Sequence, residues 1–455
     1  MKISAFLNCS VLKSIFALGV PVSIQGFLLS SLAFVDAIMV ASLSDTMLAA
    51  MGVGARWFWF ISILLFSCIS GAGVLLSQFS EREDLTEYRD IAIVSFLSLA
   101  VPSIVIASIF IFYPSIPISA FTVSVDVEIN ANIYVQCIGV LAPLTATCLF
   151  LDCIFRIDKK SITPLIAVVA EVIINITLNY GLIYGHFGLP QLGVVGAGIG
   201  SITARIVRIM ILCRFLHLTT LVKSFCVLSN IFRVDKKSFR VYYSVAAPVA
   251  VSSILWGIGL FVLQLVYASI DENTLAIISL LSPLEVVAMT LVGGIVSGAS
   301  IVIGKHLGKH EYIQAEIAKK NAIFLSIVIG GIVGLAIVIA GFFIVSVSEL
   351  SEHVKSDIYT LLPVIILAVA FRSLSSMQMQ AILKSGGDVN FCFKVDVICQ
   401  WLISLPIIVI AVYYWELALV HVLLLALLED IIKSLISYYR IKEDSWKKTL
   451  YTHSQ

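Results

Sequence analysis

Asp36 is the residue of this chain most able to do chemistry on its own. It lies in the apolar segment LAFVDAIMVASL, which holds no other charged residue. A carboxyl group in such surroundings can load and release a proton near neutral pH, or bind Na⁺ once it is deprotonated. Asp36 is therefore the first candidate for a proton or cation site. A helix-end cap and a salt-bridge partner are the two structural alternatives.

A polar stripe follows in another apolar segment. Glu171, Asn175 and Asn179 recur every four residues, so they share one face of a helix. We predict that this face joins the cation or proton site of Asp36, the alternative being hydrogen bonds that only hold helices together. In the next apolar segment, Thr203 and Arg205 would supply a hydroxyl and a counter-charge to the same face.

Further polar residues in apolar segments are candidates for a substrate cleft. Arg56 is followed directly by Trp57, and an arginine with aromatic side chains can line a binding cleft. In the second half of the chain, Glu285 and Arg372 either take part in such a cleft or simply pair with each other. The cleft candidates are Gln25, Arg56, Trp57, Arg205, Glu285 and Arg372.

Signatures of enzymes, metal sites and cofactors are missing from the sequence. It has no glycine-rich phosphate loop before a Lys and Ser/Thr, and no HExxH. The nine cysteines show no paired spacing, so we interpret them as small apolar residues. We expect no catalytic residue, no metal and no cofactor, and the net charge of +1 gives no sign of a nucleic-acid partner.

The composition places these residues in a membrane. The chain is 60% hydrophobic and 13% charged, whereas soluble domains are about half apolar and a quarter charged. A helix needs about 20 apolar residues to cross a hydrocarbon core of ~30 Å. The sequence therefore predicts an all-α membrane protein with twelve spans, near 12–43, 47–79, 90–112, 131–155, 162–186, 190–214, 241–270, 274–304, 320–346, 358–384, 391–413 and 416–438.

The basic residues predict the orientation of the spans. With the N-terminus in the cytoplasm, nearly all of the 29 Lys and Arg fall in cytoplasmic loops and helix ends, and the outer loops hold only Lys355. Such a bias marks the cytoplasmic side. Both termini are therefore expected inside, with the lipid bilayer as the surroundings of the chain.

The two halves of the chain form an internal repeat. Three pairs of segments match at offsets of 227 or 228 residues: those around Pro21 and Pro248, Ser70–Gln78 and Ser297–Lys305, and those around Arg156 and Lys384. Six helices per repeat give both halves the same orientation. We predict a six-helix lobe over 1–214, a cytoplasmic loop over 215–240, a second six-helix lobe over 241–440 and a cytoplasmic tail over 441–455.

Several segments resemble the MATE (multidrug and toxic compound extrusion) family. Arg156–Arg205 is similar to the family's run of a loop, a Pro, an Asn-x-x-x-Asp-Tyr-x-x-Ile-x-Gly stretch and a Gly-x-x-Gly-Ala-(small)-x-(small)-Thr stretch. Leu383–Asp388 resembles the second-half copy of that loop. The opening segment, with Pro21 and FVDAIMVASLSDTMLAAMGVG, is also similar to the family's first helix.

The resemblance implies a monomeric antiporter of the bacterial inner membrane with two lobes around a central cleft. It would export drugs or other amphipathic small molecules from the cytoplasm in exchange for H⁺ or Na⁺. The family's helix 1 acid matches Asp36, the helix 5 Asn and Asp of its DinF-like branch match Asn175 and Asn179, and the helix 6 Thr matches Thr203. Position 179 holds Asn instead of Asp, so this site has fewer carboxylates, and we expect Glu171, one turn earlier on the same face, to compensate.

The acids of the family's NorM-like branch are absent here. Their places fall at Trp256 and Ser373, so the resemblance favours the DinF-like branch, coupling in the first half of the chain, and H⁺ over Na⁺. The buried arginines leave a second expectation open, a flippase or exporter of lipid-linked or anionic metabolites from the same superfamily.

Overall fold

The computed structural model describes residues 8–81, 85–121, 124–222, 234–270, 272–347, 352–444 and 446–447. These residues are almost entirely helical, which confirms the all-α class. Two predicted segments lie partly outside the described residues: positions 223–233 of the loop 215–240, and positions 445 and 448–455 of the tail.

The helices of the first half follow the predicted spans closely. They are α1 (Cys9–Ala41), α2 (Asp45–Phe79), α3 (Thr86–Phe112), α4 (Ser115–Ser119), α5 (Val125–Ile157), α6 (Ile162–Tyr184), α7 (Val194–Phe215) and the short η2 (Leu216–Leu218). Ser44 starts α2, because its side chain accepts a hydrogen bond from the Met47 amide at 3.2 Å. Gly185 ends α6 in the left-handed conformation, with φ of 78°.

The second half contains longer and less regular helices. They are α9 (Lys236–Ala268), α10 (Glu272–Gly308), α11 (Tyr312–Val347), α12 (Glu352–Ser376), η3 (Met377–Lys384), α13 (Val389–Val397), η4 (Ile398–Ser404), α14 (Leu405–Tyr413) and α15 (Leu419–Lys442). The segments η3 and η4 are π-helical turns that continue α12 and join α13 to α14. The sequence did not predict these wider turns.

Eleven helical segments among the described residues are long and apolar enough to cross a membrane. The expected twelfth span is α15, which is also a long helix but carries Glu429, Asp430 and Lys433 near its middle. Six prolines lie in the interior of helices, beyond their first turns: Pro21, Pro102, Pro143, Pro248, Pro283 and Pro363. Each removes one backbone donor, which neighbouring groups in a bundle can compensate.

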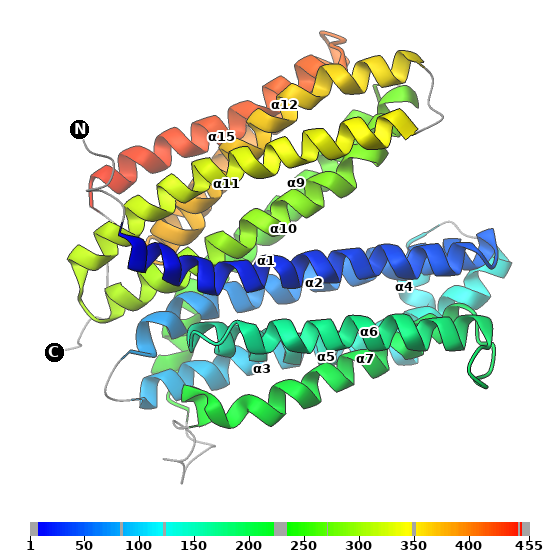
Figure 1. Cartoon of the computed structure of the whole chain (residues 1–455), viewed down its shortest axis with the longest axis horizontal. Coiled ribbons are helices and arrows are strands. Elements are labelled where there is room, and N and C mark those ends of the chain that lie inside the picture. The colour runs from blue at the N-terminus through cyan, green and yellow to red at the C-terminus, as the bar shows by residue number, and fades with distance from the viewer. Residues whose placement is uncertain are drawn as a thin grey trace. The chain divides into compact units, whose positions relative to one another are not determined.

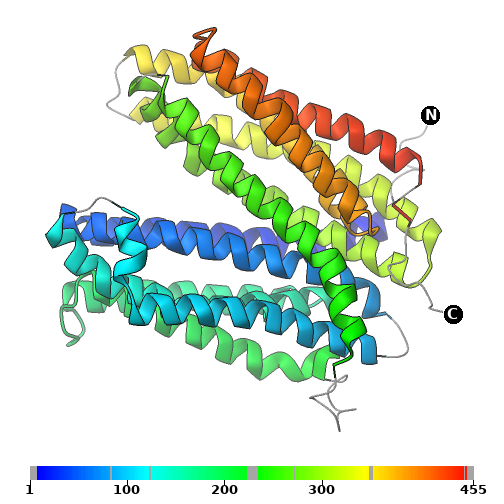
Figure 2. The same ribbon diagram turned by 180° about the vertical axis from the view of Figure 1, so that it is seen from behind.

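The chain packs as two compact units. Unit 1 comprises the described residues of Met1–Ile24 and Val251–Gln455, and unit 2 comprises those of Gln25–Ala250. The boundaries fall inside α1 and α9, so each of these helices contributes to both units; Figure 2 shows α9, in green, as one continuous helix. The six-helix lobes 1–214 and 241–440 describe the repeat along the chain and stay a prediction.

Unit 2 is built on close contacts of α5 with its neighbours. α5 packs against α2, α3 and α7, and α6 packs along α7 (Figure 1). Gly71 of α2 allows the first turns of α9 to approach, because a Cβ added there would lie 2.5 Å from the Ala246 Cα. Small residues allow this close helix packing in membrane proteins.

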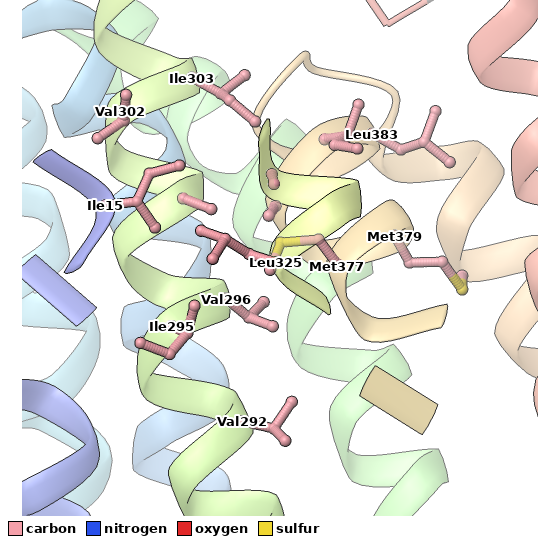
Figure 3. Packing of buried hydrophobic residues seen from close by; sticks show 14 of the residues in the cluster. Ile15, Val292, Ile295, Val296, Val302, Ile303, Leu325, Met377, Met379 and Leu383 are labelled. Atoms are coloured by element: carbon pink, nitrogen blue, oxygen red, sulfur yellow. The ribbon is translucent and has the colours of Figure 1, made fainter. Parts of the chain in front are cut away.

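Unit 1 contains a large cluster of buried apolar residues and two smaller ones. α11 packs against α10 and α12, and α12 packs against α15. Figure 3 shows part of the core, with Ile15 of α1 among side chains of α10 that include Val302. Gly19 of α1 gives no room for a side chain, since a Cβ there would lie 2.8 Å from the Ile295 Cα. This core holds α10, α11 and α12 in the arrangement that positions Glu285 and Arg372.

Candidate functional site

Asp36 belongs to a buried group of amides in unit 2. It lies near the end of α1, with 9% of its surface exposed. The side-chain amide of Asn179 donates one hydrogen bond to Asp36 Oδ1 at 2.7 Å and another to Asn175 Oδ1 at 2.9 Å. The Asn175 amide donates in turn to Ser201 Oγ at 3.0 Å. The predicted association of Asp36 with two residues of the α6 stripe is therefore present in the structure.

Gly200 of α7 makes room for this group. A Cβ added at Gly200 would lie 2.0 Å from Asn179 Oδ1. That oxygen is buried and has no hydrogen-bond partner. Only glycine at position 200 leaves Asn179 free to turn its amide towards Asp36.

Asp36 differs from the other buried carboxylates of the described chain in having a neutral partner. The others each pair with an arginine: Asp90 with Arg89, Asp152 and Glu171 with Arg208, Asp388 with Arg440 and Asp430 with Arg372. An arginine holds its carboxylate in the charged form, whereas an amide can hydrogen-bond to either protonation state. Asp36 is thus the buried acid best placed to exchange a proton.

Glu171 forms a separate group with two arginines of α7. Arg208 donates to Glu171 Oε2 at 2.7 Å and to Asp152 Oδ2 of α5 at 2.5 Å. Arg205 Nε lies 2.7 Å from Glu171 Oε1, which confirms the expected counter-charge. Glu171 is therefore committed to ion pairs one helical turn away from Asn175, and it does not supply the missing carboxylate next to Asp36.

Arg208 and Gln25 are both deeply buried. Arg208 is 2% exposed, because Asp152 offers it a buried partner. Gln25, one of the predicted cleft residues, is equally buried: it accepts a hydrogen bond from Arg156 at 3.2 Å and donates one to the Ser161 carbonyl at 3.2 Å. Sequence reasoning missed Asp152, although its spacing of four from Arg156 was a usable signal.

Thr203 is a second predicted coupling residue that stands apart from Asp36. Its side chain is exposed, and its hydroxyl donates to the Ile199 carbonyl of its own helix at 2.9 Å. Ser201, two residues earlier, supplies the hydroxyl that contacts Asn175. Since successive residues of a helix are rotated by about 100°, a shift of two positions moves a side chain to another face.

Arg56 and Trp57 lie at another part of unit 2. Trp57 is half-buried, and its indole donates to the Pro117 carbonyl at 2.9 Å. Arg56 is exposed, with its guanidinium 5.6 Å from the centre of the Phe121 ring. These contacts tie α2 to the segment around α4, and they do not bring Arg56 or Trp57 to Asp36.

Unit 1 contains the expected pair of Glu285 and Arg372, with a third member. Arg372 of α12 contacts Glu285 of α10 and donates through Nε to Asp430 of α15 at 3.1 Å. Asp430 also accepts from Ser375 Oγ at 2.7 Å. Sequence reasoning missed Asp430, because nothing in the local pattern of α15 shows which helix its carboxylate will meet.

A second charged group in unit 1 was also missed. Asp396 lies 3.3 Å from Lys433 Nζ and 3.6 Å from Lys384 Nζ, and it accepts from Ser252 Oγ at 2.5 Å. Lys433 also contacts Glu429 at 2.8 Å. Two acids and two lysines balance each other here. Among the described residues, no three His, Cys, Asp or Glu side chains gather into a group that could hold a metal ion.

Comparisons with known proteins agree with this architecture. The MatE family model matches residues 21–181 and 248–410, one match in each half of the repeat. The uncharacterized transporter YisQ of Bacillus subtilis is 20% identical and covers 98% of this chain and 99% of its own length. The probable multidrug resistance protein NorM of Photorhabdus laumondii is 24% identical, with 88% of each chain covered.

Solved structures show the same fold. One is described as the outward-facing conformation of a multidrug resistance MATE family transporter of the MOP superfamily. It aligns with a TM-score of 0.84 and 18% identity, and covers 96% of this chain and 97% of its own. The family match, the helical membrane architecture and this structural likeness together show that the chain belongs to the MatE family and is a multi-pass membrane transporter with the MATE fold.

Proposed function

We propose that this transporter exports drugs or other amphipathic small molecules from the cytoplasm of a bacterium in exchange for H⁺, with Asp36 as the proton carrier. The observation that carries this proposal is that the hydrogen-bond partner of Asp36 is a neutral side chain, the amide of Asn179. It is buried against an amide, whereas each other buried carboxylate of the described chain has an arginine partner. Relatives described as multidrug resistance proteins support drugs as the exported class over lipid-linked or anionic metabolites.

The buried charges of unit 2 suggest how protonation would act on a cationic substrate. With Asp36 ionised, three acids, Asp36, Asp152 and Glu171, balance the arginines Arg156, Arg205 and Arg208. Protonation of Asp36 leaves one positive charge in excess. A cationic compound then binds less well, and this difference in affinity between two states is what couples the two fluxes.

The rest of the proposal concerns the surroundings of Asp36. Asn179 and Asn175 orient its carboxyl group, while Glu171 and Thr203 act indirectly, Glu171 by holding the arginines of α7. This arrangement is closer to the DinF-like branch than to the NorM-like one.

The proposal also covers the whole molecule. Both termini lie in the cytoplasm, and the protein works as a monomer in the inner membrane. The lobes 1–214 and 241–440 alternate access by rocking.

Transport in proteoliposomes tests the proposal. Ethidium efflux is followed with an imposed H⁺ or Na⁺ gradient and a pH-sensitive dye, and a tenfold H⁺ gradient supplies ~1.4 kcal/mol per proton. The wild type should exchange ethidium for H⁺, and Asp36→Glu should retain exchange because it keeps the carboxyl group. Asp36→Asn should lose it. Full pH-driven export in Asp36→Asn, or export that follows only Na⁺, would refute Asp36 as the proton carrier.

A further inference from the structure

Arg372 in unit 1 is shared between two carboxylates of unequal exposure. Its partner Asp430 is nearly enclosed, with 11% of its side chain exposed, and is also held by Ser375. Its other partner, Glu285, has 55% of its side chain exposed, and Arg372 itself has 32%. Arg372 therefore bridges a buried carboxylate, Asp430, and an exposed one, Glu285.

These three residues lie well inside long helices, and two of these helices, α10 and α12, contain candidate membrane spans. Glu285, Arg372 and Asp430 are each more than ten residues from either end of their helical segments. An ionised side chain at this depth costs roughly 3 kcal/mol or more when it faces hydrocarbon. Water around the exposed sides of Glu285 and Arg372 avoids this cost, and these exposed sides are the part of the group that a solute would reach.

The charge of this group is not balanced. Glu285 and Asp430 supply two negative charges to the single positive charge of Arg372. The neighbouring group of Asp396, Glu429, Lys384 and Lys433 is balanced and has no cation to spare. One negative charge therefore remains, and Glu285 is the carboxylate that a solute can reach.

We propose that Glu285 binds the cationic group of a transported amphipathic compound, and that Arg372 is a tethered cation that occupies Glu285 when no compound is bound. On binding, Arg372 gives up Glu285 and keeps its contact with Asp430, so the buried acid never loses its partner. The affinity for the compound is then set by its competition with Arg372. This inference rests on the proposed function, because it names the residues that receive the exported compound.

Equilibrium binding of tetraphenylphosphonium to the purified protein in lipid nanodiscs, with no gradient, tests this inference. Glu285→Gln should weaken binding about tenfold, the equivalent of ~1.4 kcal/mol. The double variant Arg372→Gln/Asp430→Asn removes the competitor together with its buried partner, so it leaves no unpaired buried charge. It should bind tetraphenylphosphonium about tenfold more tightly.

Two more variants make the test independent of the folding of the double variant. Arg372→Lys keeps the charge, but an ammonium group holds two carboxylates less firmly than a guanidinium does, so tetraphenylphosphonium should again bind more tightly. Glu352→Gln removes an acid that is 91% exposed at the start of α12, and it should bind like the wild type.

Several results would overturn the inference. They are unchanged binding in Glu285→Gln, weaker binding in the folded double variant or in Arg372→Lys, and a gain in binding of an anionic dye in Glu285→Gln, which would make Arg372 the binding group. The outcome is separate from that of the proposed function. Binding that depends on Glu285 without H⁺-driven exchange would refute only the coupling by Asp36, and the reverse pattern would refute only this inference.

Discussion

At the scale of single residues, the partner of a buried carboxylate matters more than its burial. Asp36 and Asp152 are both buried in unit 2, but one contacts an amide and the other a guanidinium. Removing an arginine from a buried ion pair costs about 3–5 kcal/mol, so Asp152 is committed to its contact with Arg208. Asp36 is under no such constraint.

Gly200 offers a way to disturb Asp36 without changing any polar group. In Gly200→Ala the new methyl group overlaps Asn179 Oδ1, so Asn179 must turn away from Asp36. We expect H⁺-driven ethidium export to fall at least about tenfold, because one charge-assisted hydrogen bond is worth roughly 1.5–3 kcal/mol. The measurement is the initial rate of export in proteoliposomes at equal protein content.

Gly52→Ala is the matched control. Gly52 is also a helical glycine of unit 2, and a Cβ added there meets nothing within 4 Å. This variant should keep the wild-type rate and gain up to about 1 kcal/mol of helix stability. Equal export by both variants would mean that the contact between Asn179 and Asp36 has no part in coupling.

At the scale of helices, a buried charged network ties three elements of unit 2 together. Arg208 of α7 contacts Glu171 of α6 and Asp152 of α5 at the same time. Arg205 contacts Glu171 alone and is more exposed, with 13% of its side chain accessible. The two arginines lie one turn apart on the same helix, but Arg208 contacts two carboxylates whereas Arg205 contacts one.

Two substitutions on α7 should therefore differ in their effect on stability. Arg208→Met leaves Asp152 and one oxygen of Glu171 without their closest partner, and it should cost about 3–5 kcal/mol. Arg205→Met leaves Glu171 paired with Arg208 and should cost about 1 kcal/mol. The thermal unfolding midpoint of the detergent-solubilised protein gives the comparison. A lower midpoint for Arg205→Met than for Arg208→Met would contradict the assigned network.

At the scale of the whole molecule, the repeat and the family match coincide. The two matched stretches begin at residues 21 and 248, the same offset that relates Pro21 to Pro248. Six helices per half put both termini and the loop that joins the halves on the same side, and the basic residues predict that this side is the cytoplasm.

Labelling of introduced cysteines with a membrane-impermeant maleimide tests this orientation. Glu352→Cys, at the start of α12, should react in intact cells, whereas Lys237→Cys, near the start of α9, should react only after permeabilisation. The unsubstituted chain gives the background, since Cys9 and Cys213 are exposed thiols. Labelling of Lys237→Cys in intact cells would reverse the predicted topology.

The sequence by itself determined the membrane environment, the all-α class, the repeat and the pairing of Asp36 with the stripe of α6. The membrane environment and the helices depend on patterns that lie within about 20 to 35 neighbouring residues: apolar length, periodicity of four and local charge bias. The repeat and the contact of Asp36 with α6 relate such segments to one another, at an offset of 227 residues for the repeat and across 143 residues for Asp36 and Asn179. The same patterns placed the ends of most helices within a few residues. The largest difference is at α11, which begins at Tyr312 rather than near 320, because its charged first turns extend beyond the apolar stretch.

Only the tertiary structure decided which charges meet. Arg208 finds Asp152 across 56 residues, and Arg372 finds Asp430 across 58. These contacts depend on how each helix is rotated about its axis and how deeply it is placed, and an apolar pattern leaves both free when the whole surface of a helix is hydrophobic. For the same reason Gln25 proved to be buried, Thr203 turned away from Asp36, and Ser201 took its place.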